Sequence, residues 1–357
     1  MGKYSSGVLY GEELTALYND AKDNNFALPA VNVIGTNTAN AALEAAAEVK
    51  SPIIIQASNG GAQFIAGKGM PNDNLQANIA GGVSLGLHIH NVAKYYGVPV
   101  VLHTDHAARK WLPWVDGLLT AGEQFKKEKG VPLYSSHMLD LSEEPLQDII
   151  SSSLPYLKRT NDLGMTLEVE FGVTGGEEDG VDNSGVENHL LYSQPEEIWQ
   201  AYEAFSKVSN NFTIAAAFGN VHGVYSPGNV SLHPEILDNT QKFIAEKLGL
   251  PAGSKPVYFV FHGGSGSEKA KISQSLQYGV IKMNIDTDTQ WAFWDGILEF
   301  YKKNEAYLQA QLGNPTGADA PNKKFYDPRV WLREAEKSFT KRLVESFQDL
   351  NAINRNA

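Results

Sequence analysis

Eight short apolar runs alternate with helix-like segments along the chain, and this pattern predicts an α/β fold, a TIM (β/α)8 barrel. Several runs lack the polar–apolar alternation of a half-exposed strand, as expected for parallel strands that are buried on both faces. Four of the runs end in residues with metal-binding chemistry. The runs lie at residues 26–34, 51–58, 98–106, 132–141, 165–172, 212–220, 257–264 and 279–288.

Helix signals lie between these runs. Thr36 or Asn37 is expected to cap the helix that follows the first run, and Ser142 is expected to start another helix after the fourth run. Pro195 stands where the first turn of a later helix is expected. Repeated strand–helix alternation favours a parallel sheet, and eight repeats are the number that closes a barrel.

The chain has 357 residues, which exceeds the roughly 250 residues typical of such barrels. We assign the excess to two long loops, at residues 60–74 and 172–185, and to a C-terminal helical extension at about 288–352. Long loops of this kind are often active-site covers. No linker or internal repeat interrupts the pattern, so residues 1–357 are expected to form a single barrel domain. A doubly wound protein of two domains is the structural alternative.

The composition excludes several classes of protein. Cysteine is absent, which excludes disulfides, thiolate nucleophiles and zinc–thiolate sites, so any metal must be held by histidine and carboxylate. The net charge of -12 argues against a surface for nucleic acid or anionic membrane. No apolar run approaches the roughly 18 residues of a membrane span, and the first residues do not resemble a signal peptide. We therefore expect a cytoplasmic protein.

The polar ends of four strands suggest one convergent metal site. His106, Glu170, His222 and His262 each end an apolar run, and the carboxyl ends of barrel strands open at one face of the fold. Three imidazoles that leave an open coordination position suit a catalytic Zn²⁺. Asp140 and Glu170 are carboxylates that can bind a second metal position or orient a ligating histidine.

The remaining histidines are expected to have other roles. His88 and His90 lie in a predicted helix and are expected to pack against the barrel. His103 precedes His106 by three residues, so strand alternation places it on the opposite side, and we expect it to be structural. His137 lies within a run and can point either way.

Two acidic segments are candidates for acid–base chemistry. Asp105 directly precedes His106 and can face the pocket beside the ion, although an Asp at this place can also cap a turn. The loop TGGEEDGVDN contains Glu177 and Glu178. Such a loop is often only a solvated surface, but beside a metal site it can bring a base to the substrate on closure.

The last two predicted strands are followed by candidate phosphate-binding segments. The segment from His262 to Ser267 is glycine-rich and is expected to open a helix, and Asn284 to Thr287 ends the next strand. Backbone N–H groups at a helix N-terminus bind anions, and phosphate sites recur after the last two strands of such barrels. Neither the P-loop nor the dinucleotide-binding glycine fingerprint is present.

The strings LPAVNV, HTDHAARKWLPW, SSHMLDLSEE, TGGEEDGVDN, FGNVHGVY, FHGGSGS, KMNIDTDTQ and NKKFYDPRVWLR resemble the class II, metal-dependent fructose-1,6-bisphosphate aldolases. The resemblance runs from about residue 10 to the C-terminus, and the long loops and C-terminal extension resemble the homodimeric subgroup. It implies a zinc-dependent carbon–carbon lyase of glycolysis and gluconeogenesis. The implied reaction is the reversible aldol cleavage of fructose 1,6-bisphosphate to dihydroxyacetone phosphate and glyceraldehyde 3-phosphate.

The resemblance also implies roles for the metal-binding and catalytic candidates. His106, His222 and His262 would hold the catalytic Zn²⁺, and Asp140 and Glu170 would supply a more buried alternative metal position.

Three acidic residues would move protons. Asp105 would exchange a proton with the oxygen at the bond that is cleaved or made. Glu178 would take a proton from dihydroxyacetone phosphate, with Glu177 beside it. Many relatives have Cys directly after the Asp-His pair, whereas this chain has Ala107.

Further residues would bind substrate or a monovalent cation. Asn32 and Ser58 would contact the substrate, Ser58 on the glyceraldehyde 3-phosphate side, and Arg329 would reach the far phosphate from the partner subunit. The dihydroxyacetone phosphate half would be held by Gly223, Gly263, Gly264, Ser265, Asn284, Asp286 and Thr287. Backbone carbonyls near Val221, Gly223, Gly263 and Ser265 would bind a monovalent cation such as K⁺ or Na⁺.

Three alternatives remain open. A lysine Schiff base on Lys282, the lysine of the last predicted strand, could stabilise the carbanion instead of a metal. Tagatose 1,6-bisphosphate could be the substrate, with the same machinery. A non-catalytic protein that binds metal and sugar phosphate is the alternative from a different class.

Overall fold

The computed structural model describes residues 2–172, 175–178, 181–182, 192–222 and 232–357. Eight parallel strands form a closed ring in chain order, because β12 pairs with β2 and β4 pairs with β5. The strands are β2 (Leu28–Asn32), β3 (Ile53–Ala57), β4 (Pro99–Thr104), β5 (Ser136–Leu139), β6 (Thr166–Phe171), β9 (Phe212–Ala216), β11 (Phe259–Phe261) and β12 (Val280–Ile285). Each lies within one of the eight predicted runs, so the prediction of a (β/α)8 barrel is confirmed.

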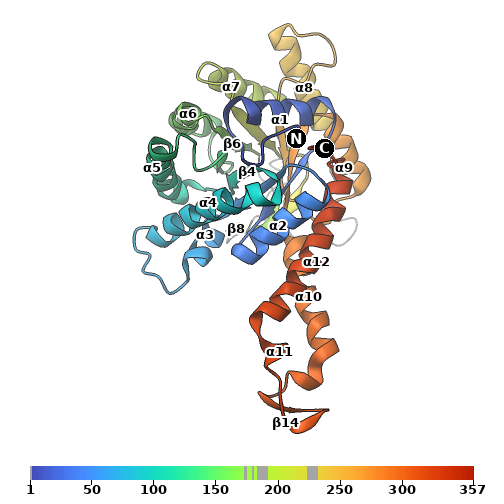
Figure 1. The fold of residues 1–357 in the computed structure, drawn as a ribbon. Helices are drawn as coiled ribbons and strands as arrows, with labels where there is room; N and C mark the ends of the chain where they lie inside the picture. The colour runs from blue at the N-terminus through green and yellow to red at the C-terminus, as the bar shows by residue number, and fades with distance from the viewer. Residues whose placement is uncertain (1, 173–174, 179–180, 183–191, 223–231) are drawn as a thin grey trace.

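Helices follow the strands and surround the barrel (Figure 1). They are α2 (Thr36–Glu48), α3 (Asn59–Ala66), α4 (Gln76–Tyr96), α5 (Leu112–Lys129), α6 (Leu146–Leu163), α7 (Pro195–Ser206), α8 (Glu235–Leu248), α9 (Lys269–Gln277) and α10 (Thr287–Asn304), with α1 (Gly11–Asp23) preceding β2. The side chains of His88 and His90 are part-buried on α4, as predicted. No described helix has the combination of length and apolar character that crossing a bilayer requires.

Two of the predicted helix starts are wrong. Helix α2 begins at Thr36 after Gly35, and the hydroxyl of Thr38 accepts the N–H of Ile34 in place of a cap from Thr36 or Asn37. Helix α6 begins at Leu146, four residues after Ser142. In both places a nearby polar side chain satisfies loop backbone or another side chain instead, which local propensity cannot distinguish from capping. Pro195 does begin α7, as predicted.

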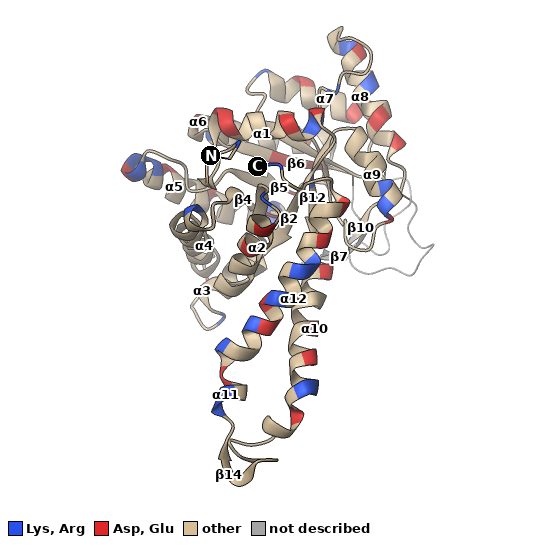
Figure 2. Ribbon diagram, turned by 45° about the vertical axis from the view of Figure 1, so that its right-hand side comes forward, with Lys and Arg blue, Asp and Glu red and all other residues tan. Residues whose placement is uncertain are grey.

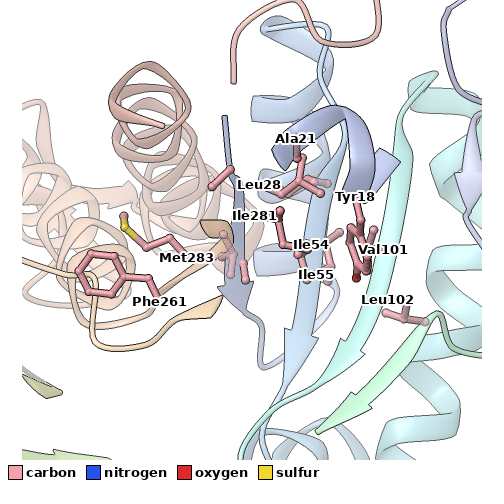
Figure 3. Packing of buried hydrophobic residues seen from close by; sticks show 14 of the residues in the cluster. Tyr18, Ala21, Leu28, Ile54, Ile55, Val101, Leu102, Phe261, Ile281 and Met283 are labelled. Atoms are coloured by element: carbon pink, nitrogen blue, oxygen red, sulfur yellow. The ribbon is translucent and has the colours of Figure 1, made fainter. Parts of the chain in front are cut away.

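Apolar side chains of the strands and helices form one buried core, with Ile54, Ile281 and Ala21 among its members (Figure 3). Polar side chains also lie inside the barrel: Lys282 of β12 contacts both Glu168 of β6 and His103 of β4. These strands are not neighbours in the ring, so the contact must cross the barrel interior. The polar side chains of these three strands therefore point inward.

The C-terminal extension forms an arm that projects from the barrel (Figure 1). It runs from α10 through the hairpin β13 (Leu312–Asn314) and β14 (Gly317–Pro321) to α11 (Lys323–Tyr326), and returns along α12 (Pro328–Asp349). Helix α12 is anchored by the buried Phe339, Leu343 and Phe347. Acidic and basic side chains are interspersed along its length (Figure 2).

Two further strand pairings complete the described fold. The short strand β1 (Gly7–Val8) pairs in parallel with β4. A separate sheet joins β10 (Val221–His222), β7 (Gly175–Glu178) and β8 (Val181–Asp182). This small sheet brings the acidic loop after β6 beside the chain that follows β9.

Candidate metal centre and active site

Two overlapping groups of ligand atoms lie at the carboxyl ends of the barrel strands. Asp105, His106 and His262 form one group, and His106, Asp140 and Glu170 form the other; within each, the ligand atoms lie within 4.8 Å of one another. The residues come from the ends of β4, β5, β6 and β11. Four of the five predicted ligands are thus brought together by the fold.

His106 is turned into the site by its backbone. Its φ of 39° lies in the left-handed region, which is unusual for a residue with a side chain, and its N–H donates to the sulfur of Met138. The ring Nδ1 lies 3.0 Å from Asp140 Oδ2 and 3.6 Å from Glu170 Oε2. The turn explains why Asp105 and His106, although adjacent, can both face the same pocket. Strained backbone of this kind is typical of functional sites.

His262 is buried between two carboxylates. Its Nε2 lies 2.8 Å from Glu168 Oε1, and its Nδ1 lies 3.3 Å from Glu170 Oε2. The ring centroid is 4.6 Å from that of His106. The His262 side chain is 1% exposed and that of His106 is 11% exposed, so the site is only slightly accessible to bulk water.

The electrostatics of the pocket favour positive charge. Burial opposes ionisation of His106, but Asp105, Asp140 and Glu170 outweigh it and raise its pKa to about 10. In the same way burial opposes protonation of His262, and Glu170 and Glu168 raise its pKa. The pKa of Asp140 is well below its usual range because His106, despite burial, stabilises the anion.

This set of groups fits a divalent metal ion. Imidazole nitrogens and carboxylate oxygens are the ligands that zinc uses when thiolates are absent, and the buried carboxylates compensate the charge of a cation. The same carboxylates could orient the imidazoles, because second partners of ligating histidines are commonly carboxylates.

Asp105 is held by two amides inside the barrel. Asn32 Nδ2 donates to Oδ2 at 3.0 Å, and Asn284 Nδ2 donates to Oδ1 at 3.1 Å. Gln56 Nε2 in turn donates to the Asn32 carbonyl at 2.7 Å. Burial raises the pKa of Asp105, but His106, Lys282 and further nearby histidines lower it below the ordinary value. Asp105 is therefore a carboxylate with a fixed orientation beside the metal centre.

The glycine-rich segment after β11 lies against the end of β12. Gly263 has a φ of 62°, and Gly264 N–H donates to Asn284 O at 3.2 Å. A Cβ on Gly264 would lie 2.6 Å from Met283 Cγ and 2.8 Å from Asn284 O, so only glycine fits there. The Ser265 hydroxyl accepts Asp288 N–H at 3.3 Å in the first turn of α10. The segment thus meets the N-terminus of α10, which begins with Asp286 as its cap and Thr287.

The segment from His262 to Ser267 leads into a helix, as predicted. Helix α9 begins at Lys269, with Glu268 as its N-terminal cap residue. The helix N-terminus that the Ser265 hydroxyl contacts, however, is that of α10, which follows the next strand.

The other predicted substrate residues occupy two different places. Ser58 is buried and caps α3 through a hydrogen bond from Gly61 N–H at 3.2 Å, close in sequence to the end of β3. Arg329 lies on the arm, has 88% of its side chain exposed and pairs with Asp327. The structure therefore brings Ser58 to the barrel end and keeps Arg329 away from it.

Several predicted residues are described only in part. The backbone of His222 pairs in β10 with Gly176, and the backbones of Glu177 and Glu178 pair in β7 with β8. Their side chains, and all of Gly223, lie outside the described residues. The pairing nevertheless places the chain at His222 directly beside the strand that holds both glutamates.

Sequence reasoning missed two buried polar residues, Gln56 and Glu168. Gln56 interrupts the apolar run IIIQA, and Glu168 lies two residues before Glu170 on β6. Strand alternation therefore points Glu168 to the same side as Glu170. Both could have been identified from the sequence, because each is a polar residue within an otherwise apolar strand and faces the same side as a polar residue near the strand end.

Comparisons with known proteins agree with this geometry. The family model described as "Fructose-bisphosphate aldolase class-II" matches residues 12–355. The chain is 60% identical over 351 residues to "Fructose-bisphosphate aldolase" of Campylobacter jejuni, covering 98% of each sequence. It is 59% identical over 348 residues to "Fructose-bisphosphate aldolase class 2" of Escherichia coli K12, covering 97% of this chain and 96% of the relative.

Solved structures give the same result. The crystal structure of the Campylobacter jejuni fructose-bisphosphate aldolase matches with a TM-score of 0.89 at 58% identity, covering 99% of this chain and 98% of the other. The YdjI aldolase of Escherichia coli matches with a TM-score of 0.65 at 20% identity, over 95% of this chain and 97% of the other, and shows the shared fold alone.

Proposed function

The chain belongs to the class II fructose-bisphosphate aldolase family, and from this premise we propose that it cleaves fructose 1,6-bisphosphate reversibly into dihydroxyacetone phosphate and glyceraldehyde 3-phosphate. The convergence of Asp105, His106 and His262 at the barrel end carries the proposal. The enzyme would act in the cytoplasm, in glycolysis and gluconeogenesis, on small sugar phosphates.

We assign the metal ion as zinc, held by His106, His222 and His262. When bound, it acts as a Lewis acid that withdraws electrons from the ketone oxygen of the sugar. The two neighbouring imidazoles of His106 and His262 and the absence of cysteine in the chain support zinc held through nitrogen. Asp140 and Glu170, which lie beside His106, would supply the more buried alternative position.

Asp105 would be the acid–base group at the bond that breaks. Its lowered pKa keeps it ionised at neutral pH, so in the cleavage direction it can accept the proton of the hydroxyl on the aldehyde half. The oxygen then forms the aldehyde carbonyl, and the electrons of the broken carbon–carbon bond pass to the ketone half. In synthesis the same carboxyl returns the proton to the new hydroxyl. The amides of Asn32 and Asn284 aim the carboxylate.

Glu178 would exchange the second proton, the one on carbon of the ketone half, with Glu177 beside it. The pairing of β7 with β10 supports this role, because it anchors the acidic loop next to the chain at His222. A base on a loop after β6 can approach a bound substrate from above the barrel and close the site to water.

The glycine-rich segment would hold the phosphate of the ketone half. Gly263, Gly264 and Ser265 meet the start of α10 at Asp286 and Thr287, where backbone N–H groups and the helix dipole favour an anion. Gly223 would join them, and Asn284 would contact the ketone half beside Asp105. Carbonyls near Val221, Gly223, Gly263 and Ser265 would bind a monovalent cation such as K⁺ or Na⁺.

We further propose a homodimer in which Arg329 of one subunit reaches the far phosphate in its partner's site. The arm projects from the barrel and cannot fold back onto its own site without losing the packing of α12 (Figure 1). Large side chains on it are exposed, with Trp291 61% and Trp294 51% accessible. Exposed aromatic side chains on a projecting element are typical of a surface covered by another chain.

The other candidate functions have less support. Lys282 is buried and its ammonium contacts both oxygens of Glu168, whereas a Schiff-base lysine needs a neutral amine that a substrate can reach. The similar proteins named above are fructose-bisphosphate aldolases, which does not favour the tagatose isomer or a non-catalytic protein.

Metal removal tests the proposed function directly. Dialysis of the purified protein against a chelator should abolish cleavage of fructose 1,6-bisphosphate, and added zinc should restore it. Borohydride added with substrate should not trap a covalent adduct. Full activity after complete demetallation, or reductive trapping on Lys282, would contradict the zinc mechanism. The ratio of kcat/KM for the fructose and tagatose bisphosphates decides between the two sugars.

A further inference from the structure

A buried lysine lies inside the barrel, on the amino-terminal side of the candidate metal centre. Lys282 on β12 is 3% exposed. Its ammonium donates to Glu168 Oε1 at 2.9 Å and to Glu168 Oε2 at 2.8 Å, and lies 3.3 Å from His103 Nε2. An ammonium has three protons, so these three acceptors account for all of them. The side chain is therefore fixed in one position rather than available for covalent chemistry.

His103 is the third partner of Lys282 in this cluster. Its Nδ1 lies 2.6 Å from the hydroxyl of Ser136. Since Lys282 can only donate, Nε2 of His103 must accept, and the proton of the neutral ring is then on Nδ1, where it faces Ser136. His103 was expected to be structural, and the geometry gives it a specific task, which is to hold the third proton of Lys282.

Glu168 links Lys282 to a predicted metal ligand. Its Oε1 lies 2.8 Å from His262 Nε2, and a carboxylate can only accept, so the Nε2 position of His262 must carry a proton. The neutral ring then has its lone pair on Nδ1, the nitrogen that lies 3.3 Å from Glu170 within the metal centre.

We propose that Lys282 is a positioning residue of the metal centre, which anchors Glu168 so that His262 presents Nδ1 to the metal ion. This inference deepens the function proposed above and rests on its metal site. Outer carboxylates that fix the tautomer and orientation of a ligating histidine commonly change metal affinity by about 10- to 100-fold. Here the carboxylate itself needs an anchor, because Glu168 is 2% exposed and lies in the barrel interior.

Removal of the anchor should loosen His262. In a Lys282→Met variant Glu168 is left as a buried carboxylate without its cation, which is strongly unfavourable. Glu168 must then turn away, take up a proton or admit water, and each change weakens the hydrogen bond from His262 Nε2. The substitution removes none of the groups that would bind the sugar, because Lys282 itself contacts Glu168 and His103 rather than the substrate.

Zinc affinity, measured by competition with a chromophoric chelator, tests the proposal without an activity assay. Lys282→Met should bind zinc about 10- to 100-fold more weakly than wild type, while KM for the substrate at saturating zinc stays within about twofold. Lys255→Met is the matched control, because Lys255 is part-buried and donates to Lys22 O and Asn25 Oδ1 outside the metal centre. It should lower stability and leave zinc affinity unchanged.

Each outcome decides a separate point. A wild-type protein that takes up no zinc overturns the proposed function itself. Tight zinc binding by wild type together with equal affinity of Lys282→Met overturns only the role of Lys282. If the single variant does not fold, Glu168→Met/Lys282→Met replaces it, because the pair of charges and the acceptor for His262 Nε2–H are then removed together. The double variant should show the same loss of zinc affinity, and wild-type affinity in it would overturn the proposal.

Discussion

Asn284, on the last barrel strand, donates a hydrogen bond of 3.1 Å to Asp105 at the end of the third. Asn32, on the first strand, donates to the other oxygen of the same carboxylate at 3.0 Å. Asp105 lies 73 positions from Asn32 and 179 positions from Asn284 in the chain. Closure of the barrel brings them together, and it aims a buried carboxylate at the site beside His106.

Asp105 is expected to serve turnover rather than metal binding. Asp105→Ala should retain one zinc per subunit and lose kcat by about 10²- to 10⁴-fold, the range typical of an acid–base group. Metal content by atomic absorption and steady-state kinetics check this. His106→Ala is the comparison and should lose metal and activity together. Equal metal loss in both variants would show that Asp105 is itself a ligand, as its proximity in the first group of ligand atoms allows.

Metal binding should also appear as thermal stability. A ligand that binds only the folded state at a thousandfold excess over its Kd stabilises by about 4 kcal/mol. Zinc added to the chelator-treated protein should therefore raise Tm by several degrees in differential scanning fluorimetry. The His106→Ala variant should show no zinc-dependent rise. An equal rise in that variant would place the ion elsewhere.

The arm predicts complementation between subunits. Arg329→Ala should weaken recognition of the far phosphate, because a guanidinium–phosphate contact is lost, and should lower kcat/KM by at least about tenfold. Mixed dimers of Arg329→Ala and His106→Ala subunits should regain activity, since one site then has both an intact metal centre and the partner's arginine.

A double variant with both substitutions in the same subunit is the control for this mixing experiment. Mixed with wild type, it should contribute no new activity. Failure of the two single variants to complement, although heterodimers form, would contradict action of Arg329 across the interface.

The buried His137 is expected to make the folded state less stable at acid pH. Its ring is buried on β5 with Nδ1 2.8 Å from Thr104 Oγ1, and burial, with a smaller effect of Arg159, lowers its pKa to about 3. An unfolded histidine has a pKa near 6.5, so the unfolded state binds more protons between these values. Stability is therefore lost as pH falls from about 6.5 towards 3, by about 2 kcal/mol between pH 7 and pH 5.

His137→Asn removes this titration and keeps a polar atom near Thr104. The difference in unfolding free energy between pH 7 and pH 5, from urea denaturation, should shrink by about 2 kcal/mol relative to wild type. Thr104→Val, which removes the hydroxyl partner of His137 and no titrating group, is the control and should leave the difference unchanged. An unaltered pH dependence in His137→Asn would show that the buried ring is protonated in the folded state.

Much of the fold could be predicted because each barrel strand is recognisable from its own short apolar run. A run such as that containing Ile53–Ala57 is buried in either register, and its β-branched residues favour a strand wherever it lies in the sheet. The helix starts at Thr36 and Leu146 were harder, because a polar residue near a helix end can bond to several partners that are close in sequence.

The sequence by itself determined the strand count, the absence of thiolate chemistry and the histidines at the strand ends, because these depend on residue type and local spacing. Only the tertiary structure decided that Lys282, Glu168 and His262 form a chain of contacts across the barrel, that Asn284 meets Asp105, and that Arg329 is exposed and pairs with Asp327. Such pairings depend on ring closure, twist and strand register, which bring together residues that no local pattern relates.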